Sequence, residues 1–252
     1  MKVDLAMIKL RDQFEKTVLK VTNKNITEHT KAAQKDDHAL KCDDQFVATI
    51  AITKSKVCFV DNDIEIADRN ERQNYYKSKH IDTIVLVLES PHTEEFDEDR
   101  CLGPAIGTTG DGIKNILLGN LAKFIFINDL LDYGSYFKTS SEITEGLYKL
   151  LIVNAVQYQC SLGNLEDDAS KRQRNKIFKN FFKKAAQEDF KKRLKIYNPK
   201  IIINCCTGGH YGEVDGLQKL VQEVIDSGDF SALKLIGSHP SSAFFARGFC
   251  KV

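Results

Sequence analysis

Hydrophobic residues near the start of the chain recur at helical spacing, which predicts an amphipathic helix. The residues of this face are Leu5, Ile8, Phe14, Val18 and Val21. After a polar stretch, residues 46–52 and 57–60 are rich in β-branched and aromatic side chains, and each run predicts a strand. Residues 61–63 give a turn signal, and residues 64–66 continue the meander. We therefore interpret residues 1–75 as an N-terminal extension, a helix and antiparallel strands packed on a core.

From about residue 80 the pattern changes to short apolar runs that alternate with amphipathic segments. This alternation is typical of a parallel sheet covered by helices on both faces. The expected strands are residues 83–88, 150–153, 200–203 and 233–236. The expected helices are residues 112–121, 140–148, 172–197 and 216–225. Residues 76–252 are thus predicted to form a three-layer α/β/α domain around a central, four-stranded, mostly parallel sheet.

Composition is that of an ordinary globular protein, with 42% hydrophobic and 28% charged residues among 252. No apolar run approaches the roughly 20 residues that span a bilayer, so we expect no membrane partner. The first ten residues carry three charges and lack the apolar stretch of a signal peptide, which favours a cytoplasmic location. The seven cysteines include no Cys-x-x-Cys pair, and no His or Cys spacing indicates a ligand set, so we expect no metal and no other cofactor.

Charge is nearly balanced over the whole chain but uneven along it. The formal net charge is +1, yet residues 171–195 hold eleven Lys or Arg and only two acids. Residues 94–99 hold five acids in six positions. A contact with nucleic acid must therefore be local. We expect the acidic run to point away from such a site, and a solvated helix face is the simpler interpretation of the basic segment.

Ligands of an open parallel sheet bind beyond the carboxyl ends of its strands, so residues that follow the expected strands are candidates for chemistry. Glu89 follows the first strand, Asn154 the second and His239 the fourth. A carboxylate, an amide and an imidazole would meet at one rim. Alternatively, Cys206 with His210 or His239 would form a thiol hydrolase, although no nucleophile-elbow pattern surrounds it. For each of these strand-end residues, a purely structural role in capping the strand end is a further alternative.

The segments around these residues resemble motifs of the uracil-DNA glycosylase superfamily, in the same order over the last two thirds of the chain. Residues 87–92, Val-Leu-Glu-Ser-Pro-His, are similar to its first motif, which reads Gly-Glu-Ala-Pro-Gly in the bacterial and archaeal iron–sulfur branch. Residues 98–110 resemble that branch's acidic pair and glycine-rich series. Residues 152–156 resemble the strand that ends in a base-reading Asn, residues 198–203 the next strand, and residues 239–242, His-Pro-Ser-Ser, the second catalytic motif.

The resemblance implies a monofunctional DNA N-glycosylase, which hydrolyses the glycosidic bond of a flipped-out uracil or modified pyrimidine and leaves an abasic site. Glu89 would stabilise the cationic sugar and hold the attacking water, and His239 would donate a hydrogen bond to the departing base. Asn154 would read the base edge. No Lys stands at a strand end to attack the sugar as an amine. Further base contacts are expected at Ser90, His92 and Ala105.

DNA contacts are expected at positions around both catalytic motifs. Ser241 and Ser242 would hold phosphates that flank the target nucleotide. Phe244 or Phe245 would fill the gap that the flipped nucleotide leaves, with core packing as the alternative for either ring. The remaining expected DNA contacts are Pro91 and Arg247.

Three departures from the family pattern bear on the substrate. Ala105 stands where the family stacks the target base on a Phe, and His92 stands where related branches have Gly or a Tyr that blocks 5-substituted pyrimidines. The iron–sulfur cysteines have no counterparts. These changes favour a reshaped pocket, suited to a 5-substituted cytosine of phage DNA and hence to defence. Two alternatives stay open: a non-catalytic module that binds a nucleotide or single-stranded nucleic acid, and a hydrolase of free nucleotides on the same fold.

Overall fold

The computed structural model describes residues 5–29, 41–60, 81–96, 101–127, 143–161, 168–208 and 216–252. The expected strand at residues 64–66 and the candidate His210 lie outside these ranges. Among the described residues, no helix is both long and apolar enough to cross a membrane.

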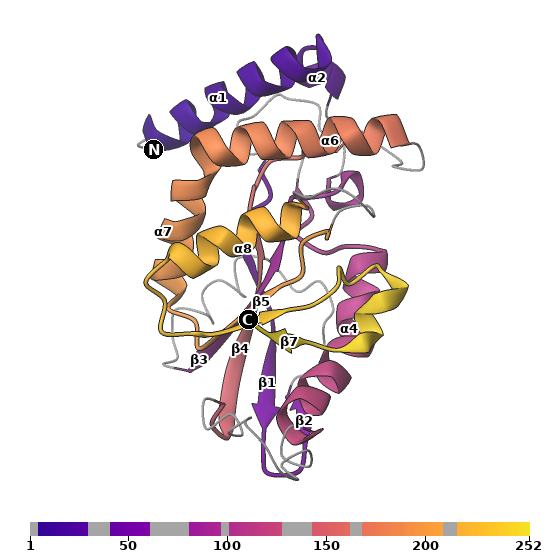
Figure 1. Cartoon of the computed structure of the whole chain (residues 1–252), viewed down its shortest axis with the longest axis vertical. Coiled ribbons are helices and arrows are strands. Elements are labelled where there is room, and N and C mark those ends of the chain that lie inside the picture. The colour runs from indigo at the N-terminus through magenta and orange to yellow at the C-terminus, as the bar shows by residue number, and fades with distance from the viewer. Residues whose placement is uncertain are drawn as a thin grey trace.

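In the described part of the chain, seven strands form one mixed sheet in the order β2-β1-β4-β3-β5-β6-β7 (Figure 1). The predicted number of four is therefore wrong, because strands from both ends of the chain hydrogen-bond to the same sheet. The four expected strands do lie together and parallel, in the order β4-β3-β5-β6. The strands are β1 (Gln45–Ile52), β2 (Val57–Phe59), β3 (Asp82–Leu88), β4 (Gly146–Asn154), β5 (Ile201–Asn204), β6 (Leu233–Ile236) and β7 (Cys250–Lys251).

Antiparallel pairing joins the N-terminal strands to this sheet. β1 runs against β4 from Gln45 opposite Ile152 to Ile52 opposite Gly146, and β2 pairs with the outer side of β1. Residues 1–75 thus contribute two strands to the sheet that carries the candidate site. β7 pairs with β6 at the opposite edge; only two residues long, it has no recognisable pattern in the sequence.

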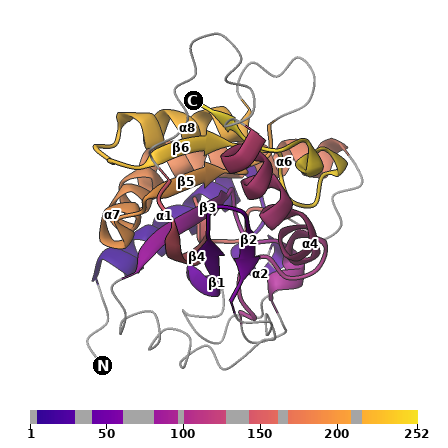
Figure 2. The same cartoon turned by 90° about the horizontal axis from the view of Figure 1, so that it is seen from below.

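Helices cover both faces of the sheet, as predicted for an α/β protein (Figure 2). Alternate residues of β3 serve the two layers, since neighbouring side chains of a strand point to opposite faces. Val85 and Val87 contribute to the core under α1 (Leu5–Thr22), α6 (Asp168–Phe181), α7 (Gln187–Tyr197) and α8 (Leu217–Ser227). Ile84 and Leu86 contribute to the core under α4 (Thr108–Ala122) and the 3₁₀ segment η4 (Ala243–Arg247). The remaining short helical segments are α2 (Ile26–His29), η1 (Thr93–Glu95), η2 (Lys123–Ile127) and η3 (Phe182–Ala186).

The long helix predicted at residues 172–197 is present as α6 and α7, which a π-helical turn, η3, joins without a break. Asn198 ends it in the left-handed conformation, with φ of +42°, immediately before Pro199. The predicted N-terminal helix, α1, lies against α6 (Figure 1). Phe14 of α1 stacks on Tyr158 at 5.0 Å and meets Phe181 edge-on at 5.1 Å, so aromatic burial attaches α1 to the domain.

The helix predicted at residues 140–148 is wrong in its described part. Residues 146–148 begin β4 instead, with Tyr148 opposite Ile50 of β1. The buried Tyr148 hydroxyl donates to the Thr144 carbonyl at 2.6 Å. Pairing with a distant strand decides the conformation here, and a local pattern of hydrophobic residues contains no information about that partner.

A buried ion pair fixes the start of β1 to the carboxyl end of β4. Arg193 of α7 donates to Asp44 at 2.6 Å and to the backbone carbonyl of Asn154 at 3.0 Å. Tyr197 donates to the same carboxylate at 2.8 Å. Burial alone would lower the pKa of Arg193, but Asp44 and Asp189 raise it above its usual value. The Asp44–Arg193 pair therefore ties the N-terminal strands to the rim where the candidate site lies.

Candidate active site

The strand order reverses between β3 and β5, because the chain passes from β3 to β4 on one side and then returns to β5 on the other. In open α/β sheets, ligands bind at such a switch point, beyond the carboxyl ends of the strands. A cavity of about 250 Å³ lies here. Its titratable lining residues are Glu89, His92, Glu94, Glu95, Arg174 and His239.

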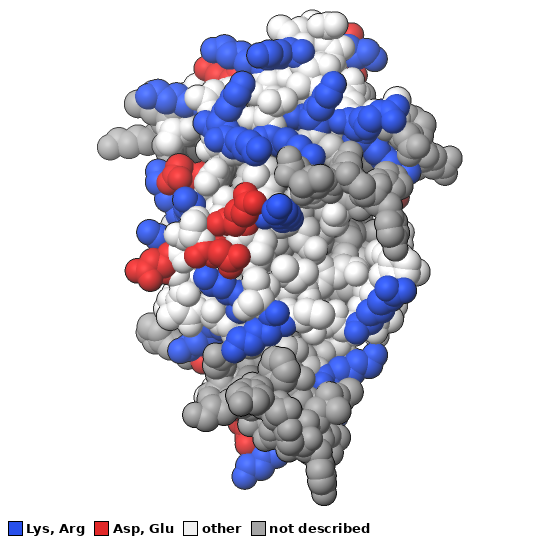
Figure 3. All heavy atoms as spheres, viewed as in Figure 1, with Lys and Arg blue, Asp and Glu red and all other residues white. Residues whose placement is uncertain are grey.

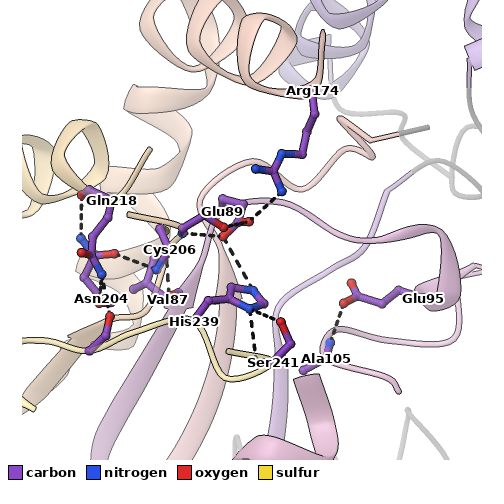
Figure 4. A network of polar contacts seen from close by, with 12 residues as sticks. Val87, Glu89, Glu95, Ala105, Arg174, Asn204, Cys206, Gln218, His239 and Ser241 are labelled. Carbon is purple, nitrogen blue, oxygen red and sulfur yellow. Dashed lines mark hydrogen bonds and ion pairs between the residues drawn. The ribbon is translucent and has the colours of Figure 1, made fainter. Parts of the chain in front are cut away.

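Glu89 follows β3, and its carboxylate is held from three sides (Figure 4). Thr207, which follows β5, donates its backbone N–H to Oε2 at 3.0 Å and its hydroxyl to Oε1 at 2.5 Å. Arg174 Nη1 lies 3.5 Å from Oε1, and His239 Nε2 lies 3.8 Å from Oε2. The residue is only 5% exposed. Glu89 is thus a buried, oriented carboxylate that faces two basic side chains.

These contacts decide the protonation state of Glu89. Burial by itself would raise the pKa of the carboxyl group. The electrostatic interactions with His239 and Arg174 and the hydrogen bond from Thr207 act in the opposite direction and together outweigh burial, so the pKa of Glu89 is lowered. Glu89 is therefore ionised at neutral pH.

His239 approaches Glu89 from the loop after β6. The backbone N–H of Ser241 donates to Nδ1 at 3.3 Å, and the Ser241 hydroxyl lies 2.8 Å from the same nitrogen. In the neutral imidazole one ring nitrogen accepts and the other carries the proton. Since Nδ1 accepts from the backbone, the proton belongs on Nε2, the atom that faces Glu89. Ser241 also lines the cavity.

Two of these site residues were not predicted from the sequence. Thr207 follows the third parallel strand, a position that the strand-end argument includes, but no role was predicted for its side chain. Arg174 comes from α6, and no local signal distinguishes it from the other basic residues of that helix. Its side chain is mostly buried, at 14% exposure, whereas the neighbouring Arg172 and Lys176 are exposed.

The acidic run was expected to point away from the site, and for its described part this is wrong. Glu94 and Glu95 both line the cavity. Glu95 is 3% exposed, and its Oε1 accepts the backbone N–H of Ala105 at 2.9 Å. Burial raises the pKa of Glu95 to about 8, since that hydrogen bond offsets it only in part. The cavity thus contains one ionised and one protonated buried carboxyl group at neutral pH.

Ser90, Pro91 and His92 line the cavity as the loop after β3. His92 caps η1: its Nδ1 accepts the backbone N–H of Glu94 at 3.5 Å. Burial lowers the pKa of His92, and the nearby Glu94 offsets this only in part. His92 is therefore a neutral, partly buried side chain at the cavity wall.

Asn154, expected to share this rim, is 1% exposed and does not line the cavity. Its register partner on β3, Leu88, does line it, so Asn154 lies one strand away. Within the described part of the chain, neither polar atom of the Asn154 amide has a hydrogen-bond partner, and the Ser161 hydroxyl of the cavity wall has none either. An unsatisfied buried polar group costs about 1–3 kcal/mol, so these atoms indicate a place where a polar ligand or water would be bound.

The remaining predicted residues lie outside the cavity lining. Ala105 is buried with φ of +59° and lines a neighbouring cavity of about 270 Å³. Ser242 caps η4 by accepting the backbone N–H of Phe244. Phe245 is fully buried and packs on Phe249, whereas Phe244 is 54% exposed. Arg247 stacks over the Phe244 ring at 4.1 Å. Of the two phenylalanines, only Phe244 is placed to reach a partner molecule.

The alternative of a cysteine nucleophile loses support from the geometry. Cys206 is fully buried, and its thiol contacts the Val87 carbonyl at 3.9 Å. Burial raises the pKa of the Cys206 thiol well above its usual value, so it is not a thiolate. Among the described residues, no three His, Cys, Asp or Glu side chains are grouped as metal ligands would be.

Comparison of the chain with protein-family models, with curated proteins and with solved structures found no match. The likeness to glycosylase motifs therefore remains a prediction from residues 80–252, and the functional argument depends on the geometry of this cavity.

Proposed function

We propose that the protein is a hydrolase of N-glycosidic bonds that acts on a nucleotide flipped out of DNA. The single observation that carries the proposal is the Glu89–His239 pair: an ionised carboxylate 3.8 Å from an imidazole Nε2, inside a cavity at the switch point of the sheet. Sugar–base cleavage develops positive charge on the sugar and negative charge on the base. A carboxylate and a hydrogen-bond donor side by side meet these two demands.

Glu89 acts through its charge in this mechanism. The conjugate acid of a strongly held carboxylate is acidic, so Glu89 is a weak general base. Its fixed negative charge instead stabilises the oxocarbenium-like sugar and orients the attacking water, without reorganisation during the reaction. Arg174 offsets part of that charge. Arg174 also holds the carboxylate in place, and its guanidinium can donate to a phosphate of the bound nucleotide.

His239 serves the leaving group. Its Nε2–H donates a hydrogen bond to the base as negative charge develops there, and Ser241 fixes the ring orientation from the other side. A neutral donor suffices, because a preorganised hydrogen bond is worth more in a site that excludes water. No lysine of the described residues lines the cavity, which favours water as the nucleophile and an abasic site as the product.

The size and polarity of the cavity suit one nucleobase. Its volume of about 250 Å³ lies just below the roughly 300 Å³ at which pockets for drug-sized ligands begin. Among the described residues, the Ser161 hydroxyl of the cavity wall has no hydrogen-bond partner and supplies a polar group for a base edge, whereas the Asn154 amide lies behind the lining. A base with a bulky 5-substituent, such as a modified cytosine of phage DNA, is the preferred target, because His92 of the cavity wall differs from the pattern for uracil.

The test is base release from duplex and single-stranded oligonucleotides that carry uracil, hypoxanthine or 5-substituted cytosines, followed by alkaline cleavage of abasic sites. We expect strand cleavage with at least one base. Glu89→Gln, which retains an acceptor for Thr207, and His239→Asn should each lower the rate roughly 10²–10³-fold, the usual effect of losing one electrostatic group. Glu223→Gln, an exposed change on α8, is the matched control and should leave the rate unchanged. Undiminished release by Glu89→Gln would contradict the mechanism.

A hydrolase of free nucleotides or nucleosides is the second candidate, and the acidic lining favours it. Glu94 adds an exposed carboxylate to the cavity wall, which repels a polymer of phosphates more than a single nucleotide. Release of free base from nucleotides but not from oligonucleotides would select this candidate. Binding of nucleotides without any base release would instead indicate a non-catalytic module.

A further inference from the structure

A second cavity lies outside the candidate site, in a groove between α1 and α6. Its volume is about 490 Å³. Lys16 and Lys20 of α1 face Lys176 of α6 and Lys184 of η3 across it, and none of the acidic residues in the described ranges lines it. All four lysines are exposed, and no ion pair with another described residue involves them. We name this surface the lysine groove.

Charge is concentrated around the lysine groove. Figure 3 shows Lys and Arg side chains in two rows across α1 and α6. Of the two acids of α1, Glu15 is paired with Arg11 at 2.8 Å, and Asp12 is not part of the groove lining. Four like charges held on two packed helices repel one another, which disfavours the unliganded arrangement. An anionic partner would relieve this repulsion.

The spacing of the lysines fits an extended polyanion. Lys176 and Lys184 are eight residues apart on one continuous helical stretch, or about 12 Å at 1.5 Å per residue. One strand of a nucleic acid advances about 3.4 Å per nucleotide, so the groove spans three to four phosphates. Lysine ammonium groups bind phosphates as point charges and impose no base sequence. Asn180 and Gln13, also in the lining, add neutral donors.

The lysine groove and the candidate site share a helix. Arg174 of α6 enters the site, and Lys176 lines the groove. At 3.6 residues per turn these side chains leave α6 about 200° apart, so roughly one helix diameter, about 10–12 Å, separates the two places. A strand with one nucleotide in the site would reach the groove three or so nucleotides further on.

We propose that the lysine groove binds the sugar–phosphate backbone of a nucleic-acid strand and that α1 exists in part to form it. A membrane surface is less suitable, because membrane-bound helices turn an apolar face to the lipid, and Val21 is the one apolar residue that the structure describes in the groove lining. The choice of DNA as the nucleic acid rests on the proposed function, whereas the phosphate contacts are argued from the groove alone.

The test measures anisotropy of a fluorescent 20-nucleotide single strand of unmodified bases as protein is titrated at several salt concentrations. Lys16→Gln/Lys20→Gln and Lys176→Gln/Lys184→Gln should each weaken binding about tenfold or more at low salt. Each pair should also lower the slope of log K against log salt by roughly 1.4, since one single-strand phosphate contact contributes about 0.7. The matched control, Lys54→Gln/Lys56→Gln, neutralises two exposed lysines in the β1–β2 turn at the far end of the molecule (Figure 1) and should stay within about twofold of the parent.

Unchanged strand binding by both groove pairs, or an equal loss in the control pair, would overturn the proposal. Vesicles that contain one-third phosphatidylserine give a second arm: vesicle binding lost in the groove pairs, with strand binding intact, would assign the groove to a membrane and also overturn it. Because the strand contains no target base, the assay is independent of base release. Groove-dependent strand binding without any base release would support the groove and reject the glycosylase, whereas base release with groove-independent binding would do the reverse.

Discussion

The surroundings of two carboxyl groups in one cavity hold them in opposite protonation states. Glu89 meets Arg174, His239 and the Thr207 N–H and stays ionised. Glu95 meets no basic side chain among the described residues; backbone N–H groups and a weak thiol contact from Cys42 at 3.8 Å do not outweigh its burial, and it stays protonated. A pair of acids with separated pKa values is what acid–base chemistry requires of a site. At neutral pH the protonated carboxyl group of Glu95 can donate a hydrogen bond, whereas the ionised carboxylate of Glu89 can only accept one.

Replacement of Glu95 should change how stability depends on pH. Above about pH 4.5 the unfolded chain releases this proton, whereas the folded protein keeps it up to about pH 8. The folded state therefore binds more protons in this window, and the free energy of unfolding falls as pH rises through it. Each unit of pKa difference corresponds to about 1.4 kcal/mol, so the loss amounts to several kcal/mol. Glu95→Gln should abolish most of it.

Thermal unfolding of both proteins between pH 5 and pH 9 measures this difference. The melting temperature of the parent should drop more steeply with pH than that of Glu95→Gln, and the exposed Glu223→Gln should follow the parent. Parallel curves for the parent and Glu95→Gln would mean that Glu95 is ionised in the folded protein.

At the scale of elements, the site depends on how closely α4 approaches the loop after β6. Gly112 of α4 lies so near the Pro240 carbonyl that a Cβ at this position would overlap the oxygen. Pro240 directly follows His239, so the absence of a side chain at residue 112 sets the position of the imidazole. A glycine within a helix normally lowers stability by about 1 kcal/mol relative to Ala, and this close approach is its structural reason.

Gly112→Ala should therefore displace the His239 loop while the helix itself remains intact. We expect base release to fall by roughly 10²-fold, the effect of a misplacement of about 1 Å at a catalytic group. Gly119→Ala in the same helix is the matched control, because a Cβ there would meet nothing within 4 Å. It should raise stability slightly and leave the rate unchanged. Equal rates for the two variants would show that Gly112 does not set the position of the His239 loop.

For the whole molecule, the Asp44–Arg193 pair links the N-terminal strands, α7 and the end of β4. The Asp44 side chain is 1% exposed, and the Arg193 side chain 11%. Asp44→Asn would leave Arg193 with an uncompensated buried charge, and removal of one partner of a buried pair typically costs 3–5 kcal/mol. Asp226→Asn, which weakens the exposed pair with Lys234 at 3.8 Å, should cost no more than about 1 kcal/mol.

Urea unfolding of the two variants checks this prediction. Similar midpoints for Asp44→Asn and Asp226→Asn would show that the extension is held by apolar contacts such as Phe14 on Tyr158 rather than by the buried pair.

The sequence by itself determined the elements whose information is local. The 3.6-residue periodicity of α1 and α6, the β-branched runs of β1 and β3, and Asn198-Pro199 as a helix end all depend on neighbours within a few residues. Strand ends also placed Glu89 and His239 at one edge, because parallel strands bring their carboxyl ends together.

Only the tertiary structure decided what depends on distant partners. The start of β4 was expected to be helical, but β1 pairs with it about 100 residues away along the chain. Packing of α6, η1 and the loop after β5 brings Arg174, Glu95 and Thr207 into the site. Such packing between distant segments cannot be recognised from the residues that neighbour each side chain in the sequence. The charge on Glu89 and the proton on Glu95 follow from the same cause, since burial and neighbouring charges exist only once the chain is folded.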